Sequence, residues 1–127
     1  MKNKNDYKIL IIDDEIELLN VTTAYLKIMG YTYLTAVTGL QGLEILSKEK
    51  IDLVICDLVL PQLTGEEIFR KLDGSSKASP AFIFCSGLDS PFKGCLPANI
   101  LAFVQKPFSM KELMMIIDKH YQLICVV

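Results

Sequence analysis

Short apolar segments recur along the chain, separated by stretches long enough to hold a helix. The central segment, Ile51–Cys56, is apolar except for one aspartate, which is typical of a strand buried on both faces of a parallel sheet. Tyr31–Val37 instead alternates polar and apolar positions, which indicates an edge strand. The predicted strands are, in chain order, Lys8–Ile12, Tyr31–Val37, Ile51–Cys56, Ala81–Cys85 and Ile100–Val104.

Helical periodicity occupies the intervals between these segments. The predicted helices cover Ile16–Ile28, Gly39–Lys48, a segment from Gly65 onward, and a last segment opened by the Ser109–Glu112 capping box. Gly30 lies where a left-handed residue would end the first helix. The interval before the fifth strand also calls for a helix, but Pro91, Gly94 and Pro97 would leave no more than a turn or two. Five strands alternating with five helical segments predict an α/β fold with a doubly wound, five-stranded parallel sheet.

Length and composition fit one globular domain. The 127 residues are 51% hydrophobic and 22% charged, which excludes a disordered chain. The net charge is −2, and no stretch beyond Lys2–Lys8 is basic, so direct binding of nucleic acid is disfavoured. No apolar run approaches the roughly 18 residues of a membrane span, and no signal-peptide pattern is present. We therefore expect a cytoplasmic location without membrane contact.

The cysteines and the single histidine do not form a metal-binding pattern. Four cysteines, at positions 56, 85, 95 and 125, have no CxxC spacing, which argues against a zinc site. Cys56 and Cys85 each close an apolar run, so we expect buried, reduced thiols. His120 lies beside the apolar stripe of the last helix and is expected at its rim rather than as a ligand.

Polar residues come directly after the predicted strands, where each strand ends. They are Asp13 and Asp14, Asp57, Ser86, and Lys106. In an open parallel sheet the carboxyl ends of the strands meet at one edge, and ligands bind there. Any one of these residues alone is explained as a turn residue. Together, in a charge-balanced set, they predict a functional site at this edge.

The adjacent acids Asp13 and Asp14 have two interpretations. With Glu17 three residues further on, Asp14 could cap the first helix. A cap leaves Asp13 unexplained, and neighbouring carboxylates at a strand end disfavour each other's ionised form unless a cation is present. Mg²⁺ suits a site with few protein ligands, all of them oxygen atoms. The sequence therefore also predicts a magnesium site.

In the order and spacing of these residues, the chain resembles a response-regulator receiver domain of two-component signalling (CheY-like). The matching features are Asp13–Asp14 after KILII, Asp57 in DLVLP with Gly65 further along, Ser86–Gly87, and Lys106–Pro107–Phe108. The resemblance extends over about residues 7–124, and we expect residues 1–127 to form a single receiver domain. It implies a flavodoxin-like sheet with strand order 2-1-3-4-5 and helices on both faces.

The resemblance also implies a role for each matching residue. Asp57 would accept the phosphoryl group. Asp14, Asp57 and the backbone carbonyl of Val59 would bind Mg²⁺ or Mn²⁺, with Asp13 acting largely through a bound water. Ser86 would donate a hydrogen bond to a phosphoryl oxygen.

The remaining roles concern the fifth strand and the residues just after it. Lys106 would pair with the phosphoryl group, and the Lys106–Pro107 bond would be cis. Phe103 would be the aromatic residue that switches together with Ser86. The family's usual output surface, formed by the fourth helix, the fifth strand and the fifth helix, would bind an effector or a second copy of the chain. The irregular Pro91–Pro97 segment departs from the regular fourth helix of this surface.

The implied phosphoryl donor is a histidine on a sensor kinase or a histidine phosphotransfer protein. The domain would not be an enzyme apart from catalysing its own phosphorylation and dephosphorylation. One alternative is an interaction module that keeps the receiver fold but works without phosphorylation. Another is a flavodoxin-type or hydrolase-type domain, although an Asp-nucleophile phosphohydrolase would want a second aspartate where Val59 stands. Whether the domain works alone or as a module of a hybrid kinase or larger regulator stays open.

Overall fold

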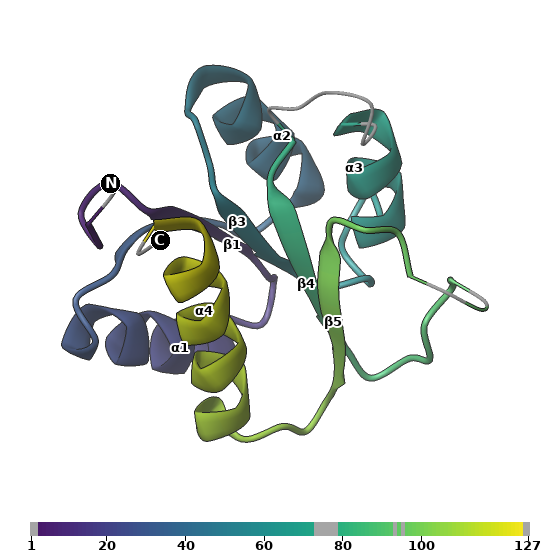
Figure 1. Ribbon diagram of the computed structural model, residues 1–127. Coiled ribbons are helices and arrows are strands. Elements are labelled where there is room, and N and C mark those ends of the chain that lie inside the picture. Colours follow the sequence, from purple (N-terminus) through teal and green to yellow (C-terminus); the bar gives the residue numbers. More distant parts are fainter. Residues whose placement is uncertain (1–2, 73–78, 93, 95, 126–127) are drawn as a thin grey trace.

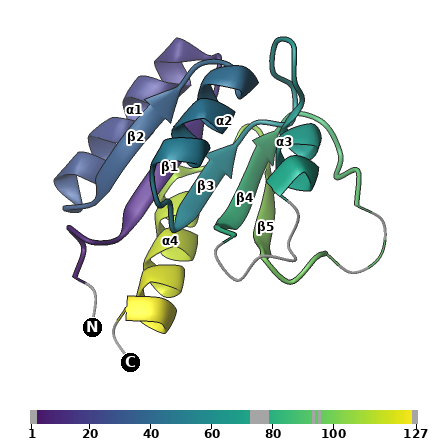
Figure 2. The same ribbon diagram turned by 90° about the horizontal axis from the view of Figure 1, so that it is seen from above.

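A five-stranded parallel sheet forms the centre of the computed structural model, which describes residues 3–72, 79–92, 94 and 96–125. The strand order is β2-β1-β3-β4-β5, so β2 and β5 are the edge strands, as Figure 2 shows. The strands are β1 (Lys8–Ile12), β2 (Thr32–Ala36), β3 (Leu53–Cys56), β4 (Ala81–Ser86) and β5 (Ile100–Gln105). The predicted fold class and strand order are confirmed.

Helices cover both faces of this sheet (Figure 1). They are α1 (Ile16–Ile28), α2 (Gly39–Lys48), α3 (Gly65–Leu72) and α4 (Met110–Cys125). One buried cluster joins α1 and α4 to the sheet, and a second joins α2 and α3 to the opposite face. The three layers are therefore helix, sheet and helix, with a core on each side.

Alternation along the strands explains the two cores. Within β1, Ile9 and Ile11 belong to the cluster under α1 and α4, whereas Leu10 and Ile12 belong to the cluster under α2 and α3. Successive strand side chains point to opposite faces, so a strand covered on both sides has to be apolar throughout. The apolar runs in the sequence are the result of this double burial.

Gly30 ends the first helix as predicted. Its φ angle is 85°, and its backbone N–H donates to the carbonyl of Lys27 while that of Tyr31 donates to Leu26. A left-handed residue at this point lets the last helical carbonyls find partners. The chain can therefore turn directly into β2.

The predicted helical segment between the fourth and fifth strands is wrong for the described residues of that interval, which form no helix. Residues 93 and 95 lie outside the described residues. Ser90 and Phe92 form a turn, in which the Ser90 hydroxyl accepts from the Phe92 backbone N–H, and Gly94 has a φ angle of 78°. Pro91 and Pro97 lack the N–H that a helix needs. The helix expected as the fifth is therefore α4.

Phe92 replaces part of the packing that a helix would supply on this face. Its ring lies 5.6 Å from the ring of Phe69 and 6.0 Å from that of Phe84, between centroids. Arg70 of α3 lies over the Phe92 ring as well, 5.3 Å from its centroid. Aromatic and cation–π contacts of this kind hold the segment against α3.

Within the described ranges, none of the helices combines the length and the apolar character that crossing a bilayer would require.

Candidate functional site

Backbone hydrogen bonds continue beyond the strands and fix the residues at their carboxyl ends. The backbone N–H of Asp57 donates to the carbonyl of Ile12, and that of Lys106 donates to the carbonyl of Ser86. Asp13 comes directly after β1 and is bonded in the same way to the end of β2. The predicted site residues of four strands therefore meet at one edge of the sheet.

Three carboxylates form the acidic part of this edge. Each of Asp13, Asp14 and Asp57 offers an oxygen atom within 4.8 Å of the others. Asp13 and Asp57 are buried, whereas Asp14 is exposed. Burial raises the pKa of Asp13, although a backbone hydrogen bond from Glu15 and the charge of Lys106 oppose that shift. An all-oxygen set of this kind fits the preference of Mg²⁺ for oxygen ligands.

Lys106 is the positive charge of the site. Its Nζ atom lies 2.8 Å from Oδ2 of Asp57, 3.2 Å from Oδ2 of Asp13 and 2.6 Å from Oε1 of Glu15. Burial acts to lower the pKa of Lys106, but hydrogen bonds to Asp57 and Glu15 outweigh it and raise the pKa. The Lys106–Pro107 bond is cis, as predicted.

Glu15 was not among the predicted site residues. It is the N-cap residue of α1, but its side chain makes no capping bond, and its carboxylate reaches Lys106 instead. Of the two interpretations of Asp14, the helix cap is therefore not the one found, because Glu15 occupies the N-cap position. The sequence held one signal for Glu15, namely that it directly continues the acidic pair.

The Asp57 carboxylate accepts hydrogen bonds on both oxygens. Oδ2 of Asp57 accepts from Lys106, and Oδ1 accepts from the backbone N–H of Val59 at 3.0 Å. The Val59 side chain is itself exposed. Ser86 is buried, and its Oγ atom accepts from the backbone N–H of Leu88 at 3.3 Å. The side chains that the resemblance assigned to phosphoryl contact are thus each held by hydrogen bonds within the protein.

Gly65 approaches the backbone of Asp57 very closely. Its N–H donates to the carbonyl of Leu58 at 2.9 Å. A Cβ atom added at Gly65 would lie 2.3 Å from the carbonyl oxygen of Asp57. Only glycine allows α3 to begin against the backbone of Asp57 and Leu58 in this way.

The family comparison agrees with this arrangement. Residues 9–118 match the model of the response regulator receiver domain. This chain belongs to that family. The receiver domain also resembles curated regulators: it is 31% identical over 111 residues to the transcriptional regulatory protein GlrR of Escherichia coli K12, covering 87% of this chain and 25% of that protein. It is 35% identical over 105 residues to KdpE of Mycobacterium tuberculosis, covering 82% of this chain and 46% of that protein.

A sensor kinase is among the similar proteins too. CckA of Brucella abortus is 34% identical over 111 residues, which cover 83% of this receiver domain and 11% of the kinase. The chain therefore spans about half or less of the length of these curated relatives. Membership of this family excludes the flavodoxin-type and hydrolase-type alternatives, and the response regulators among its relatives do not favour a module that works without phosphorylation.

Solved receiver domains share the fold. A response regulator receiver domain from Clostridium thermocellum superimposes with a TM-score of 0.75 at 28% identity, covering 92% of this chain and 95% of that one. The receiver domain of the hybrid histidine kinase CckA gives a TM-score of 0.74 at 26% identity, covering 91% and 99%.

Phe103 lies on β5 beside the site. It is the register partner of Phe84 on β4, and its partly buried side chain packs against the core under α2 and α3. The receiver domain therefore places the predicted switch residue one strand away from Ser86, whereas the switching itself stays a prediction.

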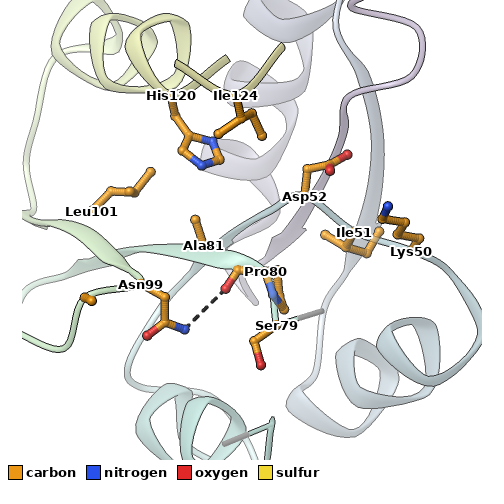
Figure 3. A pocket seen from close by; sticks show the side chains of 11 residues that line it. Lys50, Ile51, Asp52, Ser79, Pro80, Ala81, Asn99, Leu101, His120 and Ile124 are labelled. Atoms are coloured by element: carbon orange, nitrogen blue, oxygen red, sulfur yellow. Dashed lines mark hydrogen bonds between the residues drawn. The ribbon is translucent and has the colours of Figure 1, made fainter. Parts of the chain in front are cut away.

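The receiver domain also has a pocket at the end of the sheet opposite to the acids. It has a volume of about 570 Å³, and Figure 3 shows the His120 ring pointing into it from α4, with Asp52 and Asn99 on other sides. The Nδ1 atom of His120 lies 2.5 Å from the hydroxyl of the fully buried Tyr7. Burial lowers the pKa of His120. His120 is thus a partly buried rim residue, as predicted, far along the strands from the acids.

Two of the predicted buried thiols are confirmed. Cys56 and Cys85 are buried and free, and burial raises the pKa of Cys85 to about 12. Cys95 lies outside the described residues.

Proposed function

We propose that this receiver domain accepts a phosphoryl group on Asp57 from a phosphohistidine of a sensor kinase or a histidine phosphotransfer protein. The observation that supports this proposal is the position of the Asp57 carboxylate, which lies 2.8 Å from Nζ of Lys106 and within 4.8 Å of carboxylate oxygens of Asp13 and Asp14. A carboxylate oxygen attacks phosphorus, the P–N bond breaks, and its electron pair returns to the imidazole, which takes up a proton. Hydrolysis of the acyl phosphate by water restores the carboxylate and releases phosphate.

The protein contributes alignment and charge, which are the main needs of phosphoryl transfer. Asp13, Asp14 and Asp57, with the backbone carbonyl of Val59, would hold Mg²⁺ or Mn²⁺. The bound cation supplies positive charge to the carboxylate and phosphoryl oxygens, so that two anions can approach each other. Lys106 lies at hydrogen-bonding distance from Asp57 and would supply the opposing charge from the protein itself.

The signal would leave the site through Ser86 and β5. The Ser86 hydroxyl would donate to a phosphoryl oxygen, and Phe103 would turn inward into the space this opens, shifting an existing equilibrium. The output surface would then include β5 and α4, and it would bind an effector or a second copy of the chain.

The test is labelling by acetyl phosphate, detected as added mass on the intact protein. Wild type should gain one phosphoryl group in the presence of Mg²⁺, and EDTA or Asp57→Asn should abolish the gain. Asp89→Asn is the matched control, because Asp89 is an exposed aspartate near the same edge and outside the acidic group. Equal labelling of Asp57→Asn and wild type would refute the assignment.

A further inference from the structure

Lys106 already uses its full hydrogen-bonding capacity in this structure. An ammonium group has three N–H donors and no acceptor. The three acceptors within reach are carboxylate oxygens of Asp13, Glu15 and Asp57. When Asp57 carries a phosphoryl group, a phosphoryl oxygen therefore competes with the carboxylates of Asp13 and Glu15 for the donors of Lys106.

The three carboxylates differ in how easily they can leave. Asp13 and Asp57 are buried, with side chains only 8% and 7% exposed, and both belong to the acidic group of the site. The Glu15 side chain is 58% exposed and lies outside that group. A buried carboxylate that loses its partner suffers a large desolvation penalty, whereas an exposed one is solvated by water at once. Glu15 is thus the partner that Lys106 can lose most easily.

The backbone around Glu15 allows this exchange. Its N–H donates to Oδ1 of Asp13 at 2.9 Å, so the main chain at the start of α1 stays anchored when the side chain swings away. The side chain has no second role as a helix cap, because it makes no capping bond. Release of Lys106 therefore breaks neither this backbone hydrogen bond nor a helix cap.

We propose that Glu15 restrains phosphorylation of this domain by holding Lys106, and that its carboxylate is displaced when Asp57 takes up a phosphoryl group. This inference rests on the proposed function of Asp57. It adds a positioning residue that sets how readily Asp57 is phosphorylated. Removing the Glu15 carboxylate favours the phosphorylated state, because one hydrogen-bond acceptor that competes with the phosphoryl group for Lys106 is lost.

Two substitutions separate the effect of the length of the Glu15 side chain from the effect of its charge. Glu15→Gln keeps the length of the side chain and removes its charge, whereas Glu15→Asp keeps the charge and shortens the side chain by one methylene, out of reach of Nζ. Glu17→Gln is the matched control, since Glu17 is an exposed acid in the first turn of the same helix, and the Lys106 ammonium group donates to Asp13, Glu15 and Asp57 instead. The measurement is the acetyl phosphate concentration that gives half-maximal labelling of Asp57, with Mg²⁺ present.

Both Glu15 variants should lower that concentration by about two- to five-fold, the range typical of a partly exposed ion pair, and Glu17→Gln should leave it unchanged. Without any donor, the ¹⁵Nζ resonance of Lys106 should shift in both Glu15 variants and not in the control. The proposal is overturned if Glu15→Asp behaves like wild type, because the charge of Glu15 and not its hold on Lys106 would then matter. It is also overturned if both variants match wild type or need more donor. Failure of the proposed function looks different, since wild type itself would then gain no label that depends on Asp57.

Discussion

Replacing Gly65 with alanine tests the link between the start of α3 and the acceptor loop, residues 57–64, which begins with the proposed phosphoryl acceptor Asp57. The added Cβ would lie 2.3 Å from the carbonyl oxygen of Asp57 and 3.0 Å from Cα of Leu58, whereas ordinary contacts of this type begin at 3.4 Å. The obstacle is backbone on both sides, so it cannot move aside as a flexible side chain would. Either α3 or the acceptor loop has to shift by about 1 Å.

The expected loss of stability is set by that displacement. Overpacking of this kind typically costs about 1–3 kcal/mol, and alanine's better helix propensity offsets only part of it at the first helical residue. With roughly 4 °C lost per kcal/mol for a domain of this size, the melting temperature should fall by about 4–12 °C. A shift of about 1 Å at Asp57 should also slow labelling by acetyl phosphate by up to about 100-fold.

Gly87→Ala is the matched control, because Gly87 lies at the same edge of the sheet, directly after Ser86. A Cβ there would have no atom within 4 Å, and its φ angle lies outside the left-handed region. This variant should melt within about 0.5 kcal/mol of wild type. If Gly65→Ala melts and labels like wild type, or if Gly87→Ala is destabilised equally, the close approach of α3 does not position the acceptor.

Two further predictions concern His120 and the apolar residues Val59 and Leu88. Because burial lowers the pKa of His120 below its ordinary 6.5, the unfolded chain binds the proton more readily, so stability should fall as the pH drops below about 6.5. His120 is the only histidine, so His120→Gln should remove this part of the pH dependence in denaturant melts, and unchanged slopes would contradict it. Val59 and Leu88 are exposed apolar residues lining one small pocket of about 240 Å³, and neither side chain can orient a water molecule for attack. Val59→Asn and Leu88→Glu should each shorten the lifetime of the phosphorylated form, measured as loss of label after the donor is removed, and equal rates in all three proteins would refute this role.

The strands and most helices could be predicted because their causes are local. A strand buried on both faces is apolar throughout, as Ile51–Cys56 is over most of its length, and α2 begins and ends where its periodicity does. Gly30 ends α1 because a left-handed residue is needed there. The rule that the carboxyl ends of parallel strands meet at one edge is enough to bring the acids, Ser86 and Lys106 together.

Local patterns failed where partners distant in the chain decide the outcome. The segment before β5 is held by Phe92 against rings of α3 and β4, so its shape is a result of packing and not of its own periodicity. Tyr7 and His120 are 113 residues apart, and nothing near either one predicts their hydrogen bond.

The sequence by itself determined the fold class, the order of the elements and the residue types at the site. The tertiary structure decided which carboxylates share Lys106. Glu15 and Lys106 are 91 residues apart in the sequence. They meet because β5 ends beside β4 at the same edge of the sheet at which α1 begins. In the sequence alone, an acidic residue that caps a helix cannot be told from one that pairs with a lysine. Only the direction of the Glu15 side chain in the folded domain distinguishes the two roles.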